Sequence, residues 1–254
     1  MTVEIGELKI NYEICGQGDD ILFLHGWGAS LDSFRRMIAP LSQSFRCISL
    51  DFPGCGKSDL PKNPMTPDDY CKFVKEFMDK LGLENPIMIG HSNGGRTILN
   101  MCADGYASPE KIVLFGAAGI KSKKTFKQKM RQTAFKTARH TLELPIIKNY
   151  TAETLENLRK HFGSADYNSA PPVMRQTLVN LINSDVTEKL HKINASTLLI
   201  WGENDTASPL WMAKVMEKEI KDCGLVVMPS CSHWNFIENP VQTDAILKSF
   251  LGGK

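Results

Sequence analysis

The 254-residue sequence predicts an α/β fold in which a mostly parallel, twisted sheet carries helices on both faces. Short, continuous apolar runs such as 21–24 and 197–201 are typical of strands that are buried on both sides. Amphipathic helical patterns separate these runs, as the crossover connections between parallel strands require. A third observation is a glycine-flanked serine directly behind the apolar run 86–89, which predicts a sharp turn from a strand into a helix.

The first half of the chain contains most of the predicted strands. Residues 3–14 alternate between apolar and polar around Gly6, which predicts an opening hairpin of two short strands. The continuous apolar runs predict further strands at 21–24, 46–50, 86–89 and 111–115. Helical spacing of apolar residues predicts helices over 34–41, 70–81 and 96–101. The second of these begins behind the residues 66–69, Thr-Pro-Asp-Asp, and Gly82 is expected to end it.

The second half breaks this alternation and then resumes it. Residues 119–190 show helical patterns and no strand, so we expect an α-helical insertion, a lid, between two core segments, 1–118 and 191–254. Strands are predicted again at 197–201 and 225–228, and a closing helix at 241–251. The apolar faces expected in the lid are formed by Phe126, Met130 and Ala134, by Leu155, Leu158 and Phe162, and by Met174, Leu178, Leu181 and Ile182.

Composition and charge limit the possible functions. The formal net charge of +2 supports no electrostatic argument for nucleic-acid binding, and no apolar run is long enough to predict a membrane-spanning helix. The N-terminus lacks the basic and apolar segments of a signal peptide, so a cytoplasmic location is expected. The seven cysteines are scattered, which indicates reduced thiols rather than disulfides or a zinc site. No metal or cofactor is expected.

The pentapeptide 90–94, Gly-His-Ser-Asn-Gly, is the clearest sign of chemistry in the chain. A serine between two glycines at a strand-to-helix turn is held in a strained conformation with its hydroxyl exposed. Serine is a weak nucleophile unless a base accepts its proton and a third group orients that base. Ser92 is therefore a candidate nucleophile, and the sequence must also supply a histidine and an acid.

Both partners follow Ser92 in the chain, each in a loop behind a predicted strand. Asp205 lies in the loop behind 197–201, and His233 lies in the loop behind 225–228. Because the carboxyl ends of parallel strands meet at one edge of a sheet, the three side chains are expected to converge there. Glu203 is the alternative acid. His25 is the alternative histidine, although its place before Gly26 suits a role in shaping the following loop better.

A tetrahedral intermediate also needs backbone N–H donors for its oxyanion. The N–H of Asn93 is the first candidate, because it follows the nucleophile at the start of a helix, where the dipole favours negative charge. Trp27 is the second candidate donor, and its side chain is also a candidate pocket wall. Further apolar residues proposed to line a substrate pocket are Trp234, Phe236 and Met174.

Five short motifs in this order resemble the α/β-hydrolase superfamily, in its lidded single-domain branch. They are HGWG at 25–28, DFPGCGKSD at 51–59, GHSNGG at 90–95, WGENDTASP at 201–209 and SHW at 232–234. The resemblance implies an α/β-hydrolase fold and the triad order Ser, Asp, His. Haloalkane dehalogenases and epoxide hydrolases that resemble this chain carry Asp, not Ser, at the strand-to-helix turn, which is called the nucleophile elbow. Ser92 therefore argues against these two classes of enzyme. Carbon–carbon hydrolases usually show a different elbow dipeptide and a lid arginine, a place that Arg131, Arg159 or Arg175 could take.

Several functions remain open at this point. The first is a serine hydrolase that cleaves a small to medium carboxylic ester or thioester through an acyl-enzyme on Ser92. The alternative is a carbon–carbon hydrolase or a proline iminopeptidase with the same triad. A non-catalytic ligand receptor that retains the triad is the third hypothesis.

The residues 121–139 form a strongly basic stretch whose role is open. It holds eight basic side chains and no acidic one. One interpretation is a solvated helix face. The other is a surface that attracts an anionic substrate or a membrane. The eight residues are Lys121, Lys123, Lys124, Lys127, Lys129, Arg131, Lys136 and Arg139.

Overall fold

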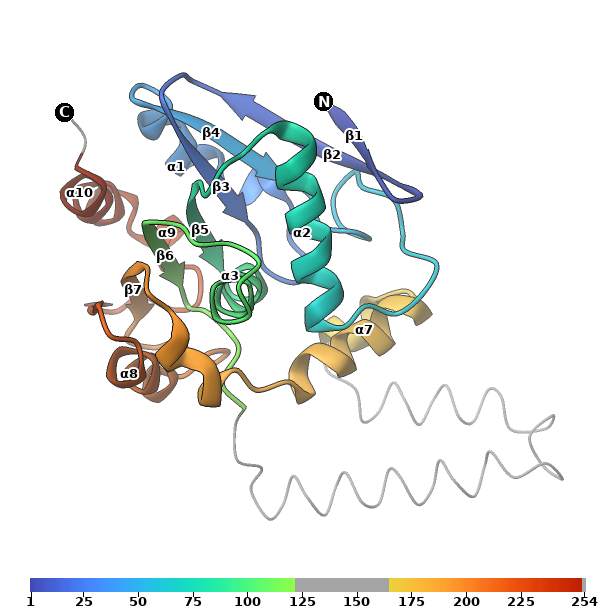
Figure 1. Ribbon diagram of the computed structural model, residues 1–254. Coiled ribbons are helices and arrows are strands. Elements are labelled where there is room, and N and C mark those ends of the chain that lie inside the picture. The colour runs from blue at the N-terminus through green and yellow to red at the C-terminus, as the bar shows by residue number, and fades with distance from the viewer. Residues whose placement is uncertain (122–164, 253–254) are drawn as a thin grey trace, which may run out of the picture.

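The computed structural model describes residues 1–121 and 165–252, which contain an eight-stranded sheet in the order β1-β2-β4-β3-β5-β6-β7-β8 (Figure 1). β1 and β2 form the antiparallel hairpin at one edge, and β2 pairs antiparallel with β4. From β4 to β8 all neighbouring pairs are parallel. The strands are β1 (Thr2–Ile5), β2 (Leu8–Cys15), β3 (Asp19–Leu24), β4 (Phe45–Leu50), β5 (Ile87–His91), β6 (Lys111–Phe115), β7 (Ser196–Gly202) and β8 (Cys223–Met228).

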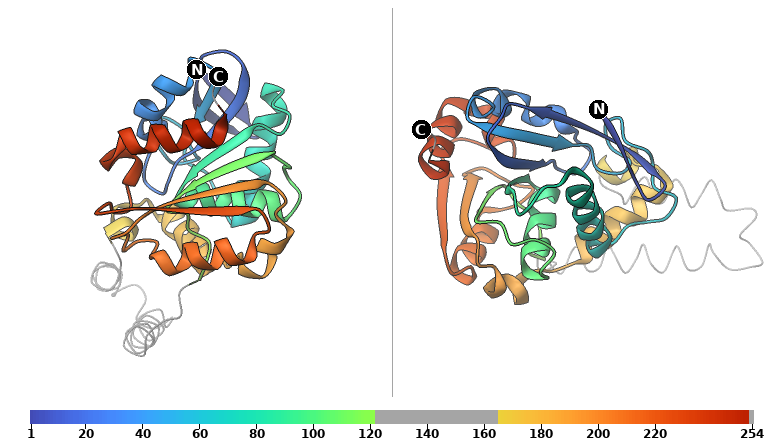
Figure 2. Two further views of the ribbon diagram at one scale, coloured as in Figure 1. Left: turned by 90° about the vertical axis from the view of Figure 1, so that its left-hand side faces the viewer. Right: turned by 45° about the horizontal axis from the view of Figure 1, so that its top comes forward.

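Helices cover both faces of the sheet, as the sequence predicts (Figure 2). On one face lie α2 (Pro67–Leu81), α3 (Asn93–Ala103) and α8 (Leu210–Glu219), which bury their apolar sides in one core cluster. On the other face lie η1 (Leu31–Phe34), α1 (Arg35–Leu41), α9 (Asn235–Glu238) and α10 (Pro240–Leu251), which share a second cluster. The central strands are buried on both sides, which explains their continuous apolar runs.

The predicted helix boundaries agree well where a local capping signal exists. The Thr66 side chain accepts from the Asp69 N–H at 3.2 Å, and the Asp69 carboxylate accepts from the Thr66 N–H at 2.8 Å, which is a capping box at the start of α2. Gly82 ends the same helix with a φ of 65°, in the left-handed region that glycine tolerates. The helix α8 was not among the elements expected from the sequence.

The predicted lid lies largely outside the described residues, including its first two apolar faces and most of the basic stretch. Its described part consists of α6 (Ala165–Ser169), α7 (Pro172–Asn183) and the short η3 (Thr187–Lys192). The Val186 N–H donates to the Gly119 carbonyl oxygen at 3.0 Å, which joins the two ends of the predicted insertion. Val186 and Leu190 are buried in the main core, so the chain is already packed against the core before residue 191.

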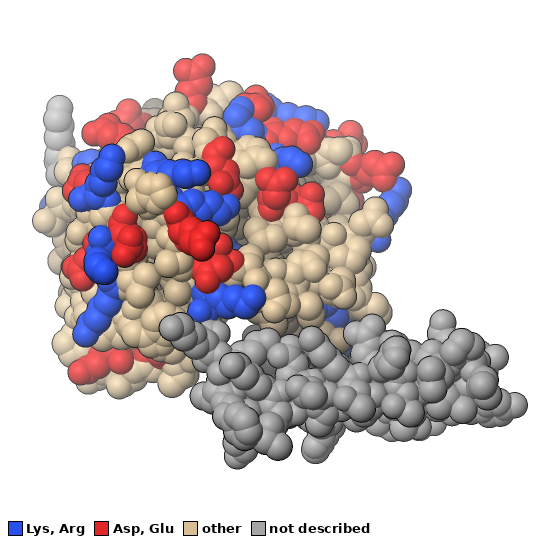
Figure 3. Space-filling view, turned by 60° about the horizontal axis from the view of Figure 1, so that its bottom comes forward, with Lys and Arg blue, Asp and Glu red and all other residues tan. Residues whose placement is uncertain are grey.

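Two observations describe the surface and the helices of residues 1–121 and 165–252. Within residues 1–121 and 165–252, no helix is long and apolar enough to cross a membrane. On the face seen in Figure 3, basic and acidic side chains are intermixed.

Close approach of α3 to the sheet gives a first prediction. A Cβ built on Gly94 would lie 1.8 Å from the Leu24 carbonyl oxygen, a contact that only a backbone shift relieves. Gly94→Ala should therefore lower the free energy of unfolding by about 3 kcal/mol or prevent folding, as measured by urea denaturation. Gly224→Ala is the matched control, because its Cβ meets no atom within 4 Å. Equal stability of the two variants would contradict the prediction.

Candidate active site

Ser92 occupies a strained turn between β5 and α3. Its backbone has a φ of 49° and a ψ of −108°, which is a rare conformation for a residue with a side chain. Three hydrogen bonds hold the turn: the Ser92 N–H donates to the Phe115 carbonyl, and the Ser92 carbonyl accepts from the N–H groups of Arg96 and Ala118, each at 3.0 Å. The turn predicted from the pentapeptide is thus present and fixed from three sides.

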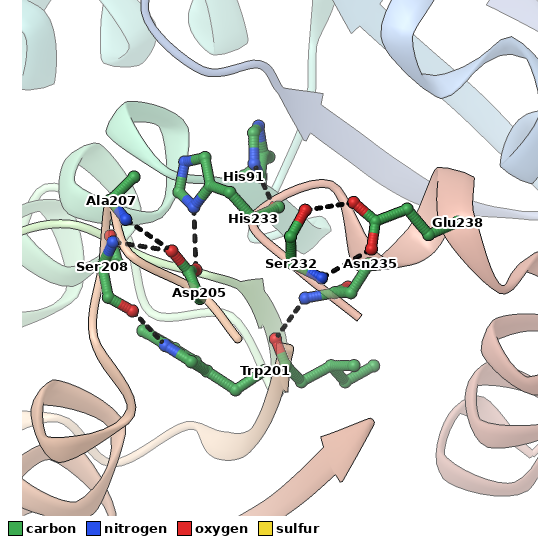
Figure 4. Close-up of polar contacts among 10 residues, drawn as sticks. His91, Trp201, Asp205, Ala207, Ser208, Ser232, His233, Asn235 and Glu238 are labelled. Atoms are coloured by element: carbon green, nitrogen blue, oxygen red, sulfur yellow. Dashed lines mark hydrogen bonds and ion pairs between the residues drawn. The ribbon is translucent and has the colours of Figure 1, made fainter. Parts of the chain in front are cut away.

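Asp205 and His233 form a close pair at the same edge of the sheet (Figure 4). The His233 Nδ1 lies 2.8 Å from the Asp205 Oδ2, and the Asp205 side chain has no exposed surface. The other carboxylate oxygen accepts from the N–H groups of Ala207 and Ser208 at 2.9 and 2.8 Å. These bonds fix the carboxylate against the imidazole, which is the arrangement by which an acid orients a histidine and stabilises its protonated form.

Sheet register explains why residues far apart in sequence meet here. His91 of β5 pairs with Phe115 of β6, and Phe115 pairs with Ile200 of β7, so the carboxyl ends of the strands align. The buried Trp201 at the end of β7 donates its indole N–H to the Ser208 carbonyl at 2.6 Å, which anchors the loop that carries the acid.

Gly116 makes room for the acid–histidine pair, and sequence reasoning missed it. A Cβ on this residue would lie 2.9 Å from the Asp205 Oδ2 and 3.0 Å from the His233 Nδ1. Its φ of 48° also favours glycine. The signal in the sequence was a glycine directly behind a predicted strand.

The two alternative residues occupy other places. Glu203 accepts from the Ser230 N–H at 3.1 Å on the exposed side of the loop and makes no contact with His233 among the described hydrogen bonds. His25 is fully buried: its Nδ1 lies 2.7 Å from the Gly26 carbonyl oxygen, and its Nε2 accepts from the Phe52 N–H at 2.9 Å. His25 thus shapes the loop that carries Trp27, which is the role that the sequence favours.

His91 lies beneath the loop that carries His233, here called the histidine loop. Sequence reasoning did not foresee this contact. Its Nε2 lies 3.1 Å from the His233 carbonyl oxygen, and its ring centroid lies 4.3 Å from that of Trp234. Burial, followed by the nearby His233, lowers the pKa of His91 to about 3. The ring is therefore neutral at physiological pH and donates its single proton from Nε2 to that carbonyl.

The two candidate oxyanion donors face a common pocket. Trp27 and Asn93 both line it with Ser92 and His233, and neither backbone N–H donates to any described residue. The Ser92 hydroxyl also makes no hydrogen bond to a described residue, and the hydrogen bonds of catalytic groups often form only when substrate binds.

This pocket has a volume of about 300 Å³, which suits a small molecule. Its described lining consists of Gly26, Trp27, His91, Ser92, Asn93, Arg96, Ala118, Leu178, Leu181, Ile182, Ala207, Ser208, His233 and Trp234. Of the residues predicted to line a pocket, Trp27 and Trp234 are among them, and Phe236 and Met174 are not. Phe236 is 4% exposed and packs in the core between Phe34 and Phe115.

Met174 also lies away from the pocket, on the buried side of α7. A Cβ on Gly54 would come within 2.7 Å of the Met174 sulfur, so this side chain fills the space above the loop behind β4. Leu178 and Ile182 of the same helix face the pocket instead. An apolar stripe at helical spacing shows that a helix packs, but it does not show which neighbour each residue meets.

Comparison with known protein families matches residues 20–240 to the alpha/beta hydrolase fold. The chain belongs to this family.

Curated relatives in this family cover almost the whole chain. A 2-hydroxy-6-oxo-6-phenylhexa-2,4-dienoate hydrolase of Comamonas testosteroni is 26% identical, over 98% of this chain and 93% of the relative. A 2-hydroxy-6-oxononadienedioate/2-hydroxy-6-oxononatrienedioate hydrolase of a Pseudomonas species is 26% identical over 98% of this chain and 95% of the relative. A solved meta-cleavage product hydrolase of Pseudomonas fluorescens IP01 has a TM-score of 0.75 and 22% identity, covering 99% and 97% of the two chains, and shows the shared fold.

The space at Gly116 gives a second prediction. Gly116→Ala should displace the Asp205–His233 pair and lower kcat of whatever reaction Ser92 supports by about a hundredfold, since small misplacements of reacting groups are costly. Gly105→Ala is the matched control: Gly105 also has a positive φ, 78°, but its Cβ would meet no atom within 4 Å. The prediction fails if the two variants lose the same share of activity.

Buried neutral histidines give a third prediction, for stability against pH. The pKa of His91 is about 3 and that of His25 is also lowered, each chiefly by burial, whereas an unfolded histidine titrates near 6.5. Below pH 6.5 the unfolded chain therefore binds more protons than the folded protein, so stability is complete above that pH and is lost as the pH falls. His91 contributes a slope that approaches about 1.4 kcal/mol per pH unit well below 6.5, and His25 acts in the same direction.

Urea denaturation at pH values from 7.5 to 5 measures this slope. Above pH 7 the stabilities of His91→Phe and the wild type should change in parallel, and between pH 6 and 5 the pH dependence of the variant should be shallower by roughly 1 kcal/mol per unit, whatever its loss of stability at neutral pH. Parallel pH curves for the wild type and the variant would refute the assignment of His91 as a buried neutral group.

Proposed function

We propose that the protein is a serine hydrolase in which Ser92 attacks a carbonyl carbon. The pairing of Asp205 with His233, which lines one pocket together with Ser92, is the observation that supports this proposal. His233 accepts the Ser92 proton as the hydroxyl attacks and then delivers it to the leaving group. The backbone N–H groups of Trp27 and Asn93 stabilise the oxyanion, and water hydrolyses the acyl-enzyme.

We further propose that the bond cleaved is a carbon–carbon bond. The curated relatives are named as hydrolases of 2-hydroxy-6-oxo dienoates. Such a compound holds a ketone and a carboxylate but no ester, so its hydrolysis must break a carbon–carbon bond beside the ketone. Attack of Ser92 on the ketone carbon makes the acyl part an ester of Ser92. The bonding electrons leave with the dienoate fragment, which takes the proton held by His233.

Hydrolysis of a carboxylic ester is the second candidate function. The elbow dipeptide His91-Ser92 favours it, because carbon–carbon hydrolases that resemble this chain usually show a different dipeptide. The same triad serves both reactions, because each begins with attack on a carbonyl carbon and passes through an oxyanion.

A substrate panel tests the proposal. We expect kcat/KM for 2-hydroxy-6-oxo-6-phenylhexa-2,4-dienoate to exceed that of p-nitrophenyl esters from acetate to octanoate by at least about tenfold. Ser92→Ala should lower kcat by about 10⁶ and Asp205→Asn by about 10⁴, because the first variant loses the nucleophile and the second loses the group that orients His233. A fluorophosphonate probe should label the wild type and not Ser92→Ala.

The outcomes separate the candidate functions. Rapid turnover of esters with none of the dienoate would favour the second candidate. Unchanged turnover in Ser92→Ala would refute the serine mechanism for both. Absence of labelling and of turnover in folded protein would instead favour a ligand-binding role.

A further inference from the structure

Arg96 is a buried arginine one helical turn beyond Ser92. Its backbone N–H donates to the Ser92 carbonyl at 3.0 Å, so it lies in the first turn of α3. Its side chain is only 9% exposed, and it lines the same pocket as Ser92 and His233. Residues four apart on a helix share a face, which places Arg96 on the side of α3 that carries the candidate nucleophile.

The charge of Arg96 has no partner among the described residues. No described carboxylate forms an ion pair with it, and its buried Nε makes no hydrogen bond. Tyr70 is the titratable residue whose charge would affect the pKa of Arg96. Burial raises the pKa of the Tyr70 phenol, so Tyr70 is neutral and does not balance the charge of Arg96. Burial lowers the pKa of Arg96 to about 10, which leaves the guanidinium protonated at neutral pH.

An uncompensated buried cation is rare in proteins, because removing a charge from water is costly. Asp205, the acid of the candidate triad, forms no ion pair with Arg96, and its two oxygens bond instead to His233 and to backbone N–H groups. The Arg96 side chain thus lies at the pocket, and its guanidinium makes no ion pair or hydrogen bond with any described residue.

A second unpaired polar group lies beside Arg96. The Asn93 side chain is 4% exposed and lines the pocket, and its buried Oδ1 has no partner among the described residues. In contrast, α7 and the histidine loop contribute the apolar side chains of Leu178, Ile182 and Trp234 to the same pocket. The pocket thus has a polar part on α3 and an apolar part elsewhere, as a ligand with an acidic end and an apolar chain would need.

We propose that Arg96 binds a carboxylate of the substrate and so determines that the enzyme acts on acidic compounds. Arginine suits this role because its planar N–H groups match the two oxygens of a carboxylate. Four helical residues rise roughly 6 Å, which leaves room for a short chain between a carboxylate at Arg96 and a carbonyl at Ser92. The assignment of the reacting carbonyl to Ser92 rests on the proposed function.

A matched pair of ligands tests the role of Arg96 without catalysis. Hexa-2,4-dienoate and its neutral amide have the same length and shape and differ in charge. By isothermal titration, we expect the acid to bind the wild-type protein about ten to a hundred times more tightly than the amide. Arg96→Gln should abolish this preference, and Arg96→Lys, which keeps the charge without the fork of donors, should retain part of it.

Arg46→Gln is the matched control. Arg46 donates from Nη2 to Asp20 at 2.7 Å near the starts of β4 and β3, at the end of these strands opposite to the pocket. Its loss should therefore leave the preference for the acid unchanged. Circular dichroism during thermal unfolding shows whether each variant is folded. If Arg96→Gln does not fold, the comparison of Arg96→Lys with the wild type carries the test.

Three results would overturn the inference: equal binding of acid and amide to the wild type, the full preference in Arg96→Gln, or its loss in Arg46→Gln. If the acid binds in a way that depends on Arg96 but the protein has no hydrolase activity, the inference is supported and the proposed function is refuted. Hydrolase activity without any preference for the acid would do the opposite.

Discussion

The strained backbone of Ser92 is the constraint on which the rest of the site depends. A residue with a side chain adopts its conformation only when the surrounding structure holds it. Here the hydrogen bonds to Phe115 and Ala118 tie the turn to β6 and to the segment behind it, while Gly94 lets α3 lie directly against the end of β3. Asn93, the first residue of α3, lines the pocket beside Ser92.

The parallel sheet turns this local feature into a site. Because β5, β6, β7 and β8 end at the same edge, the loops behind them meet above Ser92. Three residues support Asp205 and His233 there: Trp201 anchors the loop that carries Asp205, His91 lies beneath the loop that carries His233, and Gly116 leaves room for the pair. These supports hold Asp205 and His233 in a fixed orientation relative to each other.

The candidate site was predictable to different degrees, for physical reasons. Ser92, Asp205 and His233 were found because each follows an apolar strand, and strand ends are visible as local patterns. Phe236 and Met174 were expected in the pocket, yet both are buried elsewhere, because apolar character alone does not say which surface a side chain meets. Arg96 was overlooked, since an arginine in a helical pattern is usually a solvated residue.

The sequence by itself determined the fold class, the order of the strands along the chain and the residues available for nucleophilic chemistry, since these depend on periodicity and on short motifs. Only the tertiary structure decided which of the alternatives, Glu203 or Asp205, faces His233, and that the pocket holds an unpaired cation. The reason is that contacts across the sheet depend on register and burial, which join residues such as Gly116 and His233 that lie more than a hundred positions apart.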